Sequence, residues 1–231
     1  MFGIDPLYWM LMLPVMLLSF FASFRVKSAF KKYSQVRTAF GITGAQAARQ
    51  ILDRNGLNHI EVVETHGFLS DHYDPMKKVV RLSPEVYRSP SLASVGIAAH
   101  ETGHAVQHAK SYAPLMLRNM MVPVASIGSN FAWIAIMAGF FIGMMGLVKI
   151  GILLFSAVVV FQLVTLPVEF NASTRAKEML TGYGLISTGE LAGVSKVLSA
   201  AAMTYVAAAA SAIVTLLYFL LRAGLIGGRD D

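Results

Sequence analysis

Four long apolar runs constrain what this chain can fold into. They cover residues 6–24, about 120–148, about 150–166 and about 200–221. A helix needs about 20 apolar residues to cross the hydrocarbon core of a bilayer. The composition agrees, because 14% of the residues are charged, whereas about 25% is usual in a globular domain. The sequence therefore predicts a predominantly α-helical integral membrane protein with about four transmembrane helices.

The first run is expected to be a retained anchor. The residues before it, MFGID, carry no positive charge, and no clear A-x-A cleavage site follows the run. A secretory signal peptide would have both features. The chain also lacks cysteine, so disulfides, thiolate ligands and thiol nucleophiles are excluded. A metal site would have to be built from histidine and carboxylate side chains.

Basic residues are unevenly distributed between the apolar runs. Residues 25–118 hold thirteen of the nineteen Lys and Arg, namely Arg25, Lys27, Lys31, Lys32, Arg37, Arg49, Arg54, Lys77, Lys78, Arg81, Arg88, Lys110 and Arg118. Three more lie in 167–199, which leaves Lys149, Arg222 and Arg229 for the other side. Because cytoplasmic loops are enriched in Lys and Arg, we expect the N-terminus outside and both polar segments in the cytoplasm. Topology and anionic lipid then account for the net charge of +6, and no nucleic-acid partner is expected.

The polar segment changes its periodicity along the chain. Residues 26–40 and 43–56 have helical spacing, with Thr43 as N-cap and Gly56 as the C-terminal stop. IEVVE and KKVVRLS have strand-like composition, and residues 71–75 between them indicate the turn of a β-hairpin. We expect KKVVRLS to form an edge strand, which an extended peptide could join. A further helix should begin near residues 90–91 and carry three histidines.

The stretch HETGH, residues 100–104, matches H-E-x-x-H. On a helix, residues i and i+4 lie on one face, so His100 and His104 can bind one metal ion together. Glu101 projects in a neighbouring direction, where it can act as a general base on a water molecule without being a ligand. The alternative is a helix that contains histidines without a metal.

His108 has the wrong spacing for a third ligand. It follows His100 by eight residues, about 12 Å along a helix axis, and His104 stands between them. In metzincins a glycine ends the helix before the third histidine, and HAVQH has none. We expect His108 to support the site indirectly or to be exposed.

A carboxylate from elsewhere should complete the metal site. The candidates are Glu61, Glu64, Asp71, Asp74, Glu85, Glu169, Glu178 and Glu190. Topology favours Glu169, because the hairpin formed by the second and third runs returns it to the side of the histidine helix. A carboxylate at that depth is costly unless it is paired or metal-bound. The alternative is a Glu169 at the membrane interface that pairs with Arg175 or a lysine.

HETGHAVQH, an apolar hairpin and then VEFNASTRA together resemble the YugP-like neutral zinc metallopeptidases of bacterial membranes. The likeness covers nearly the whole chain, from the first anchor through FLSDHYDPMKKVVRLSPEVY to the span after LTGYGL. A more distant likeness is to HtpX and the CaaX prenyl proteases. These share H-E-x-x-H, a transmembrane interruption and a glutamate in E-F-x-A-D.

The resemblance implies a membrane-embedded zinc endopeptidase in the bacterial plasma membrane, cleaving membrane or membrane-proximal proteins. Its motif assigns one Zn²⁺ per chain to His100, His104 and Glu169, with Glu101 as the catalytic base. Ser173 stands where the distant relatives have aspartate, so a hydroxyl without charge would contact a ligand histidine. Oxyanion stabilisation is also required, and His72, Tyr73 and Tyr205 are candidates.

The expected organisation has five segments, a small α+β zincin-like domain among them. They are a transmembrane anchor (1–24), a polar catalytic segment (25–118), a transmembrane hairpin (119–166), a cytoplasmic helical segment with the third ligand (167–199), and a C-terminal transmembrane helix and tail (200–231).

Two other functions fit parts of the sequence. In a site-2-type intramembrane protease, H-E-x-x-H lies inside a membrane helix, and residues 91–109 contain no charged residue other than Glu101. That stretch is rich in Ser, Gly and His, however, and no Asn-Pro-Asp-Gly motif is present to supply a ligand. The other alternative is a non-catalytic, metal-binding membrane scaffold, which would tolerate Glu101→Gln. The oligomeric state is left open by the sequence.

Overall fold

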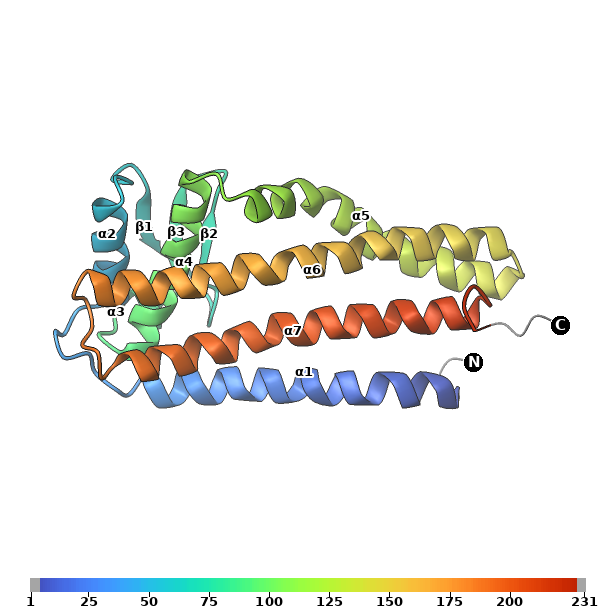
Figure 1. Ribbon diagram of the computed structural model, residues 1–231, viewed down its shortest axis with the longest axis horizontal. Coiled ribbons are helices and arrows are strands. Elements are labelled where there is room, and N and C mark those ends of the chain that lie inside the picture. The colour runs from blue at the N-terminus through green and yellow to red at the C-terminus, as the bar shows by residue number, and fades with distance from the viewer. Residues whose placement is uncertain (1–4, 228–231) are drawn as a thin grey trace. The chain divides into compact units, whose positions relative to one another are not determined.

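Seven α-helices and one three-stranded sheet make up residues 5–227, which this computed structural model describes (Figure 1). The uncharged residues 1–4 of the expected anchor and Arg229 lie outside this range. Four helices are long and apolar enough to cross a membrane. They are α1 (Pro6–Tyr33), α5 (Ala113–Ile142), α6 (Met145–Gly182) and α7 (Leu191–Arg222). The predicted class, a helical membrane protein with a small α+β part, is confirmed.

The chain divides into two compact units, and each long helix contributes residues to both. Unit 1 comprises Met1–Ala22, Met116–Pro167 and Thr204–Asp231, and unit 2 comprises Ser23–Leu115 and Val168–Met203. Within residues 5–227, the charged residues of unit 1 are Asp5, Arg118, Lys149 and Arg222. All six histidines lie in unit 2. Unit 1 is therefore mainly apolar helix, whereas unit 2 holds the histidines and most of the charged side chains.

Helices α5 and α6 of unit 1 form a hairpin with closely approaching backbones. A Cβ added at Gly128 would lie 2.7 Å from the carbonyl oxygen of Leu154, so only glycine fits there. The predicted break at Lys149 is wrong, because α5 ends at Ile142 and α6 begins at Met145. Gly143 between them has a φ of +71°, a left-handed conformation that glycine adopts without a steric penalty.

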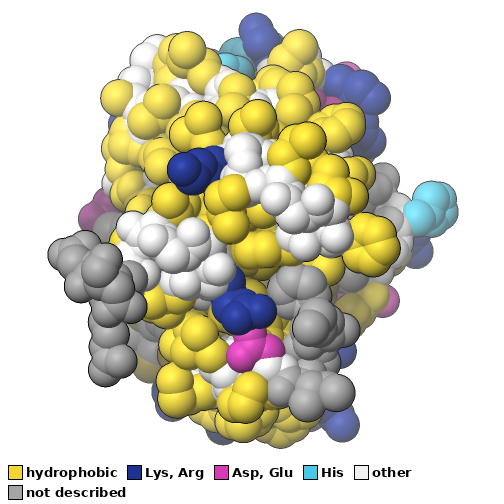
Figure 2. Space-filling view, turned by 90° about the vertical axis from the view of Figure 1, so that its right-hand side faces the viewer, with side chains coloured by type: hydrophobic (Ala, Val, Ile, Leu, Met, Phe, Trp, Pro, Cys, Tyr) yellow, Lys and Arg dark blue, Asp and Glu magenta, His cyan; other side chains and the backbone are white. Residues whose placement is uncertain are grey.

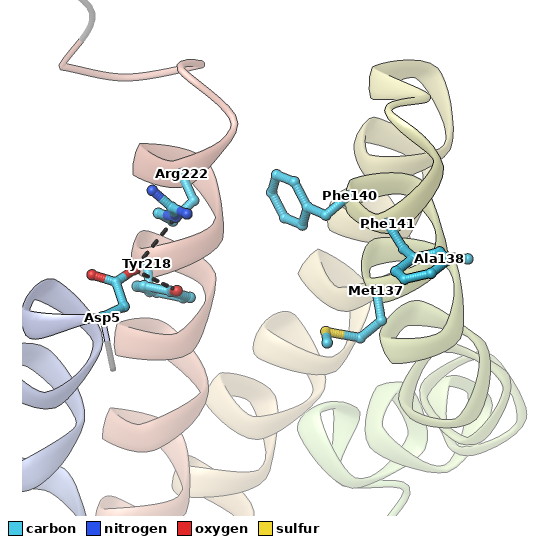
Figure 3. A pocket seen from close by; sticks show the side chains of 7 residues that line it. All are labelled: Asp5, Met137, Ala138, Phe140, Phe141, Tyr218 and Arg222. Atoms are coloured by element: carbon cyan, nitrogen blue, oxygen red, sulfur yellow. Dashed lines mark hydrogen bonds and ion pairs between the residues drawn. The ribbon is translucent and has the colours of Figure 1, made fainter. Parts of the chain in front are cut away.

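The surface of unit 1 is strongly apolar. Phe141 is 92% exposed and Phe20 is 75% exposed, and the face drawn in Figure 2 is mostly hydrophobic with few charged groups. A pocket of about 580 Å³ opens in this unit (Figure 3). Arg222 and the hydroxyl of Tyr218 both contact the Asp5 carboxylate there, at 3.4 and 2.9 Å, and α5 lines the facing wall. None of the described residues that line this pocket is a histidine.

Unit 2 contains the remaining elements, and their sequence signals explain where they begin. They are α2 (Gly44–Arg54), β1 (Glu61–Glu64), β2 (His72–Asp74), β3 (Val79–Leu82), α3 (Pro84–Arg88) and α4 (Leu92–Ala109). Thr43 caps α2 in a capping box with Gln46, which satisfies two backbone donors reciprocally. Gly56 follows with a φ of +72°. The predicted helix over 26–40 is only partly present, because α1 ends at Tyr33 and the following backbone instead bonds to Pro90 and Leu92.

The sheet differs from the predicted hairpin. Its order is β1-β3-β2, with β1 parallel and β2 antiparallel to β3. KKVVRLS therefore contributes the central strand β3, and the prediction that it is an edge strand is wrong. The predicted turn 71–75 contains β2, which takes the edge position beside β3. Val80 and Leu82 of β3 are fully buried in the core of unit 2, as expected of a central strand.

Candidate metal centre

Helix α4 is built to lie close to its neighbours. Its N-cap Ser91 accepts a hydrogen bond from the backbone N–H of Ser94, and a stripe of small buried residues follows. A Cβ added at Gly103 would lie 2.8 Å from the backbone oxygen of Ala172. The α4 backbone thus contacts α6 directly, one residue before His104 and three residues after Glu169.

His100, His104 and Glu169 come together at this contact. The Nε2 atom of His100 lies 3.2 Å from Oε2 of Glu169, and that of His104 lies 3.6 Å from the same oxygen. One ligand atom from each residue falls within 4.8 Å of the others. The Glu169 side chain is 3% exposed, whereas the two imidazoles keep 13% and 12% of their surface accessible. The cluster is therefore buried on its carboxylate side and reachable on its histidine side.

Two of these spacings fit a tetrahedral zinc ion. Zinc binds His nitrogen and carboxylate oxygen at about 2.1 Å, so two ligand atoms at a tetrahedral angle lie about 3.4 Å apart. The two distances from Glu169, 3.2 and 3.6 Å, bracket that value. The three ligand atoms together spread over as much as 4.8 Å, so the imidazoles must turn inward to share one ion. Two histidines and one carboxylate are also a donor set used by catalytic zinc sites, which keep a fourth position open.

The other ring nitrogen of each histidine has a protein partner. His100 Nδ1 lies 3.1 Å from the hydroxyl of Ser173, and His104 Nδ1 lies 3.0 Å from Oε1 of Gln107. Such partners orient a ligand imidazole and fix which nitrogen faces the metal. Burial by itself lowers the pKa of His104, but its hydrogen bond to Glu169 and the charge of Glu101 raise that pKa overall.

Glu101 is held apart from the three clustered side chains. Its Oε2 accepts a hydrogen bond of 3.1 Å from the backbone N–H of Tyr73, the middle residue of the edge strand β2. Glu169 pairs with the two histidines, whereas Arg175 donates to Asn171. The alternative in which Arg175 neutralises Glu169 is therefore not observed.

His108 and Tyr73 form a second polar contact on the same side of α4. The Tyr73 hydroxyl lies 2.9 Å from His108 Nδ1, and His108 is outside the metal-type cluster found among the described residues. Both residues line a cavity of about 260 Å³, together with Leu57, His59, Ile60, Lys78, Ala105 and Ala109. The backbone N–H of Tyr73 thus bonds to Glu101, and the same residue lines this cavity.

Three of the remaining candidate carboxylates bind other partners. Asp71 accepts hydrogen bonds from the backbone and hydroxyl of Ser83, Glu64 pairs with Arg88, and Glu190 accepts from Ala39 and Ser187. Burial raises the pKa of Asp71, the negative charge of Glu101 adds to the rise, and the bonds from Ser83 oppose it.

His72 and Tyr205 are two of the expected oxyanion stabilisers. His72 is exposed and its Nδ1 contacts the backbone oxygen of Ser70, and Tyr205 belongs to unit 1. Gln107 and Asn171 were not singled out from the sequence, and Arg175 was considered only as a partner of Glu169. The signals that could have found them are a glutamine three residues after His104 and an Asn and Arg four residues apart after Glu169.

Comparisons with known proteins agree with one another. The model of a family described as "Putative neutral zinc metallopeptidase" matches residues 8–224. A protein of Bacillus subtilis (strain 168) named "Putative membrane protease YugP" is 50% identical over 214 residues, covering 93% of this chain and 94% of that protein. No solved structure matches the chain.

Proposed function

The chain belongs to the neutral zinc metallopeptidase family, and from this premise we propose that it is a membrane-embedded zinc endopeptidase. It binds one Zn²⁺ per chain through His100, His104 and Glu169, and Glu101 is its general base. Its substrates are membrane or membrane-proximal proteins. The observation that carries the proposal is the convergence of three ligand atoms within 4.8 Å beside a separate carboxylate.

Zinc and Glu101 have different roles in the proposed reaction. When bound, zinc lowers the pKa of a water molecule and polarises a carbonyl group. Glu101 takes a proton from the attacking water as it adds to the scissile carbonyl. The same carboxyl then gives that proton to the departing amine as the C–N bond breaks, so protons balance over the cycle. The Tyr73 N–H, 3.1 Å from Glu101, keeps this carboxylate off the metal-ligand cluster.

The edge strand offers a binding mode for an extended peptide. β2 pairs with β3 along one side, and within residues 5–227 no further strand pairs with its other side. Backbone pairing with such an edge holds a peptide irrespective of its sequence, and pockets then select its side chains. The cavity of about 260 Å³ beside Tyr73 and His108 is suited to receive one such side chain. We propose the Tyr73 hydroxyl as the oxyanion donor, because the backbone N–H of the same residue bonds to Glu101.

The site-2-type alternative is less well supported. It requires the histidine helix to cross the membrane, and α4 is not among the four candidate spans within residues 5–227. Val95, Ala98 and Val106 of α4 instead belong to the core of unit 2, together with α2 and the sheet. From the distribution of Lys and Arg we propose that residues 25–118 and 167–199 lie in the cytoplasm of a bacterial cell, with the N-terminus outside.

Zinc content and proteolysis of matched variants test this proposal. The purified chain should contain about one zinc ion and cleave an unfolded casein probe. Glu101→Gln should keep the zinc and lose at least about 100-fold in cleavage rate, the usual contribution of a general base. Glu169→Ala should lose most of the zinc. Glu178→Ala, an exposed change on the same helix, should alter neither quantity.

Two outcomes would contradict the assignment. Full zinc occupancy in Glu169→Ala would show that another residue completes the site. Undiminished cleavage by Glu101→Gln would remove the general base and leave the metal-binding scaffold as the better description.

A further inference from the structure

Gln107 is a fully buried amide directly behind His104. None of its surface is exposed, although burying an amide is costly unless its hydrogen bonds are made. Its Oε1 lies 3.0 Å from His104 Nδ1, and its Nε2 lies 2.9 Å from the backbone oxygen of Val168 and 3.0 Å from Oδ1 of Asn171. The side chain therefore joins a histidine of α4 to the stretch of α6 that carries Glu169.

Arg175 fixes the direction of this chain of hydrogen bonds. Its Nε lies 2.7 Å from Oδ1 of Asn171, and a guanidinium can only donate. The Asn171 atom that faces it must therefore be the carbonyl oxygen. Arg175 is itself placed over the ring of Tyr112, with 5.9 Å between the guanidinium carbon and the ring centroid.

The orientation of Gln107 follows. The atom of its amide group that faces α6 meets two acceptors, the Asn171 oxygen and the Val168 carbonyl. Only the NH₂ group can donate to both, so the carbonyl oxygen must face His104. An acceptor at that position requires a proton on His104 Nδ1. His104 is thus held with a proton on Nδ1, and its Nε2 faces Glu169 in the cluster.

His100 is held differently. Its Nδ1 faces the hydroxyl of Ser173, which can donate or accept. That partner is compatible with either tautomer. Of the two histidines in the cluster, only His104 therefore has its ring nitrogens assigned by an unbroken series of one-way hydrogen bonds.

We propose that Gln107 is a positioning residue for the metal centre, and that Asn171 and Arg175 act through it to present His104 Nε2 to the ion. This inference rests on the proposed zinc site. Removing such a partner of a ligand histidine lowers metal affinity by about 10- to 100-fold.

Three substitutions separate this role from a merely structural one. Gln107→Met keeps the volume and removes every hydrogen bond. Gln107→Glu keeps an acceptor for His104, but its second oxygen meets the acceptors of Val168 and Asn171. Thr102→Val is the matched control, because its buried hydroxyl bonds only to Ala98 and Ala99 of its own helix.

Two quantities should respond differently to these substitutions. One is the zinc affinity, measured by competition with a chelator, and the other is the melting temperature of the metal-free chain. Gln107→Met should weaken zinc binding by about 10- to 100-fold. Gln107→Glu should bind zinc more tightly than Gln107→Met and yet melt at a lower temperature. Thr102→Val should bind zinc as the wild type does.

The tautomer can be read directly. In metal-free protein labelled with ¹⁵N-histidine, at an alkaline pH where the His104 resonances show a neutral ring, Nδ1 should carry the proton and Nε2 should be bare. The opposite tautomer, or wild-type zinc affinity in Gln107→Met, would overturn the inference. A wild type that binds no zinc would instead refute the proposed function, and the tautomer would still decide the inference.

Discussion

At the scale of single residues, the environment of each carboxylate decides its role. Glu169 is buried against two imidazoles, Glu101 is held by a backbone N–H, and Asp71 bonds to Ser83. The spacing of HETGH could predict that His100 and His104 lie together, because i and i+4 on a helix share a face. The contacts of Gln107 with Val168 and Asn171 could not be predicted, because they join residues 61 and 64 positions apart in the sequence.

Asp71 and Asp74 should give opposite pH dependences of stability. Burial raises the pKa of Asp71, so the folded state binds its proton more tightly than the unfolded chain does. The free energy of unfolding should therefore fall as pH rises from about 3.9, the ordinary aspartate value, through the raised pKa. Asp71→Asn stays neutral, and its melting temperature relative to wild type should rise across that interval.

Asp74 provides the matched control for this measurement. Hydrogen bonds from the Lys77 and Met76 backbones lower its pKa. Its contribution is complete above about pH 3.9 and is lost as pH falls through the lowered pKa. Asp74→Asn should therefore lose stability relative to wild type at neutral pH and approach it in acid. Equal slopes for the two variants would contradict both assignments.

At the scale of elements, two close contacts and one short strand determine the site. α4 meets α6 at Gly103, and β2 brings Tyr73 to Glu101. Helix α4 could be predicted from its N-cap and its small residues. β2 could not, because Asp71, His72 and Asp74 favour turns, and three residues are too few to show a strand period. Its edge position depends on parallel pairing of β1 with β3, which local sequence does not encode.

Gly103→Ala should weaken both the fold and metal binding. Its new Cβ would lie 2.8 Å from the Ala172 backbone oxygen, so α4 and α6 must separate and move Glu169 away from the histidines. Overpacking of this kind costs about 1–3 kcal/mol. Thermal melting of the metal-free chain and zinc affinity should both decrease.

Gly96→Ala on the same helix is the control for helix propensity. Its Cβ would meet only a methyl group of Val194, at 3.2 Å, which a small side-chain shift can relieve. Alanine favours helix over glycine by about 1 kcal/mol, so stability should be nearly unchanged or higher. If both variants lost zinc affinity equally, the Gly103 contact would not be what positions Glu169.

At the scale of the whole molecule, the two units suit different solvents, lipid for unit 1 and water for unit 2. Unit 1 exposes apolar side chains and carries few charges, whereas unit 2 holds the histidines and most of the charged residues. Apolar runs could predict this division, because burial in lipid requires about 20 apolar residues. They could not predict the residues at which one environment replaces the other, since the helices continue from one unit into the next.

The proposed topology can be tested by cysteine labelling, because the natural chain has no cysteine. Glu85→Cys and Lys110→Cys flank α4, Glu178→Cys follows Glu169 on α6, and Lys149→Cys lies near the α5–α6 turn. All four positions are exposed. A membrane-impermeant maleimide applied to intact cells should label only Lys149→Cys. After permeabilisation it should label all four.

The pattern of labelling decides between the two protease mechanisms. Glu101 and Glu169 can act in one centre only if the segments that carry them share a side of the membrane, so positions 110 and 178 must behave alike. Labelling of positions 85 and 110 from opposite sides would make α4 a spanning helix and favour the site-2-type alternative. If only positions 85, 110 and 178 were labelled in intact cells, the orientation of the chain would be the inverse of the proposed one. Glu101 and Glu169 would still lie on the same side of the membrane, as the chemistry requires.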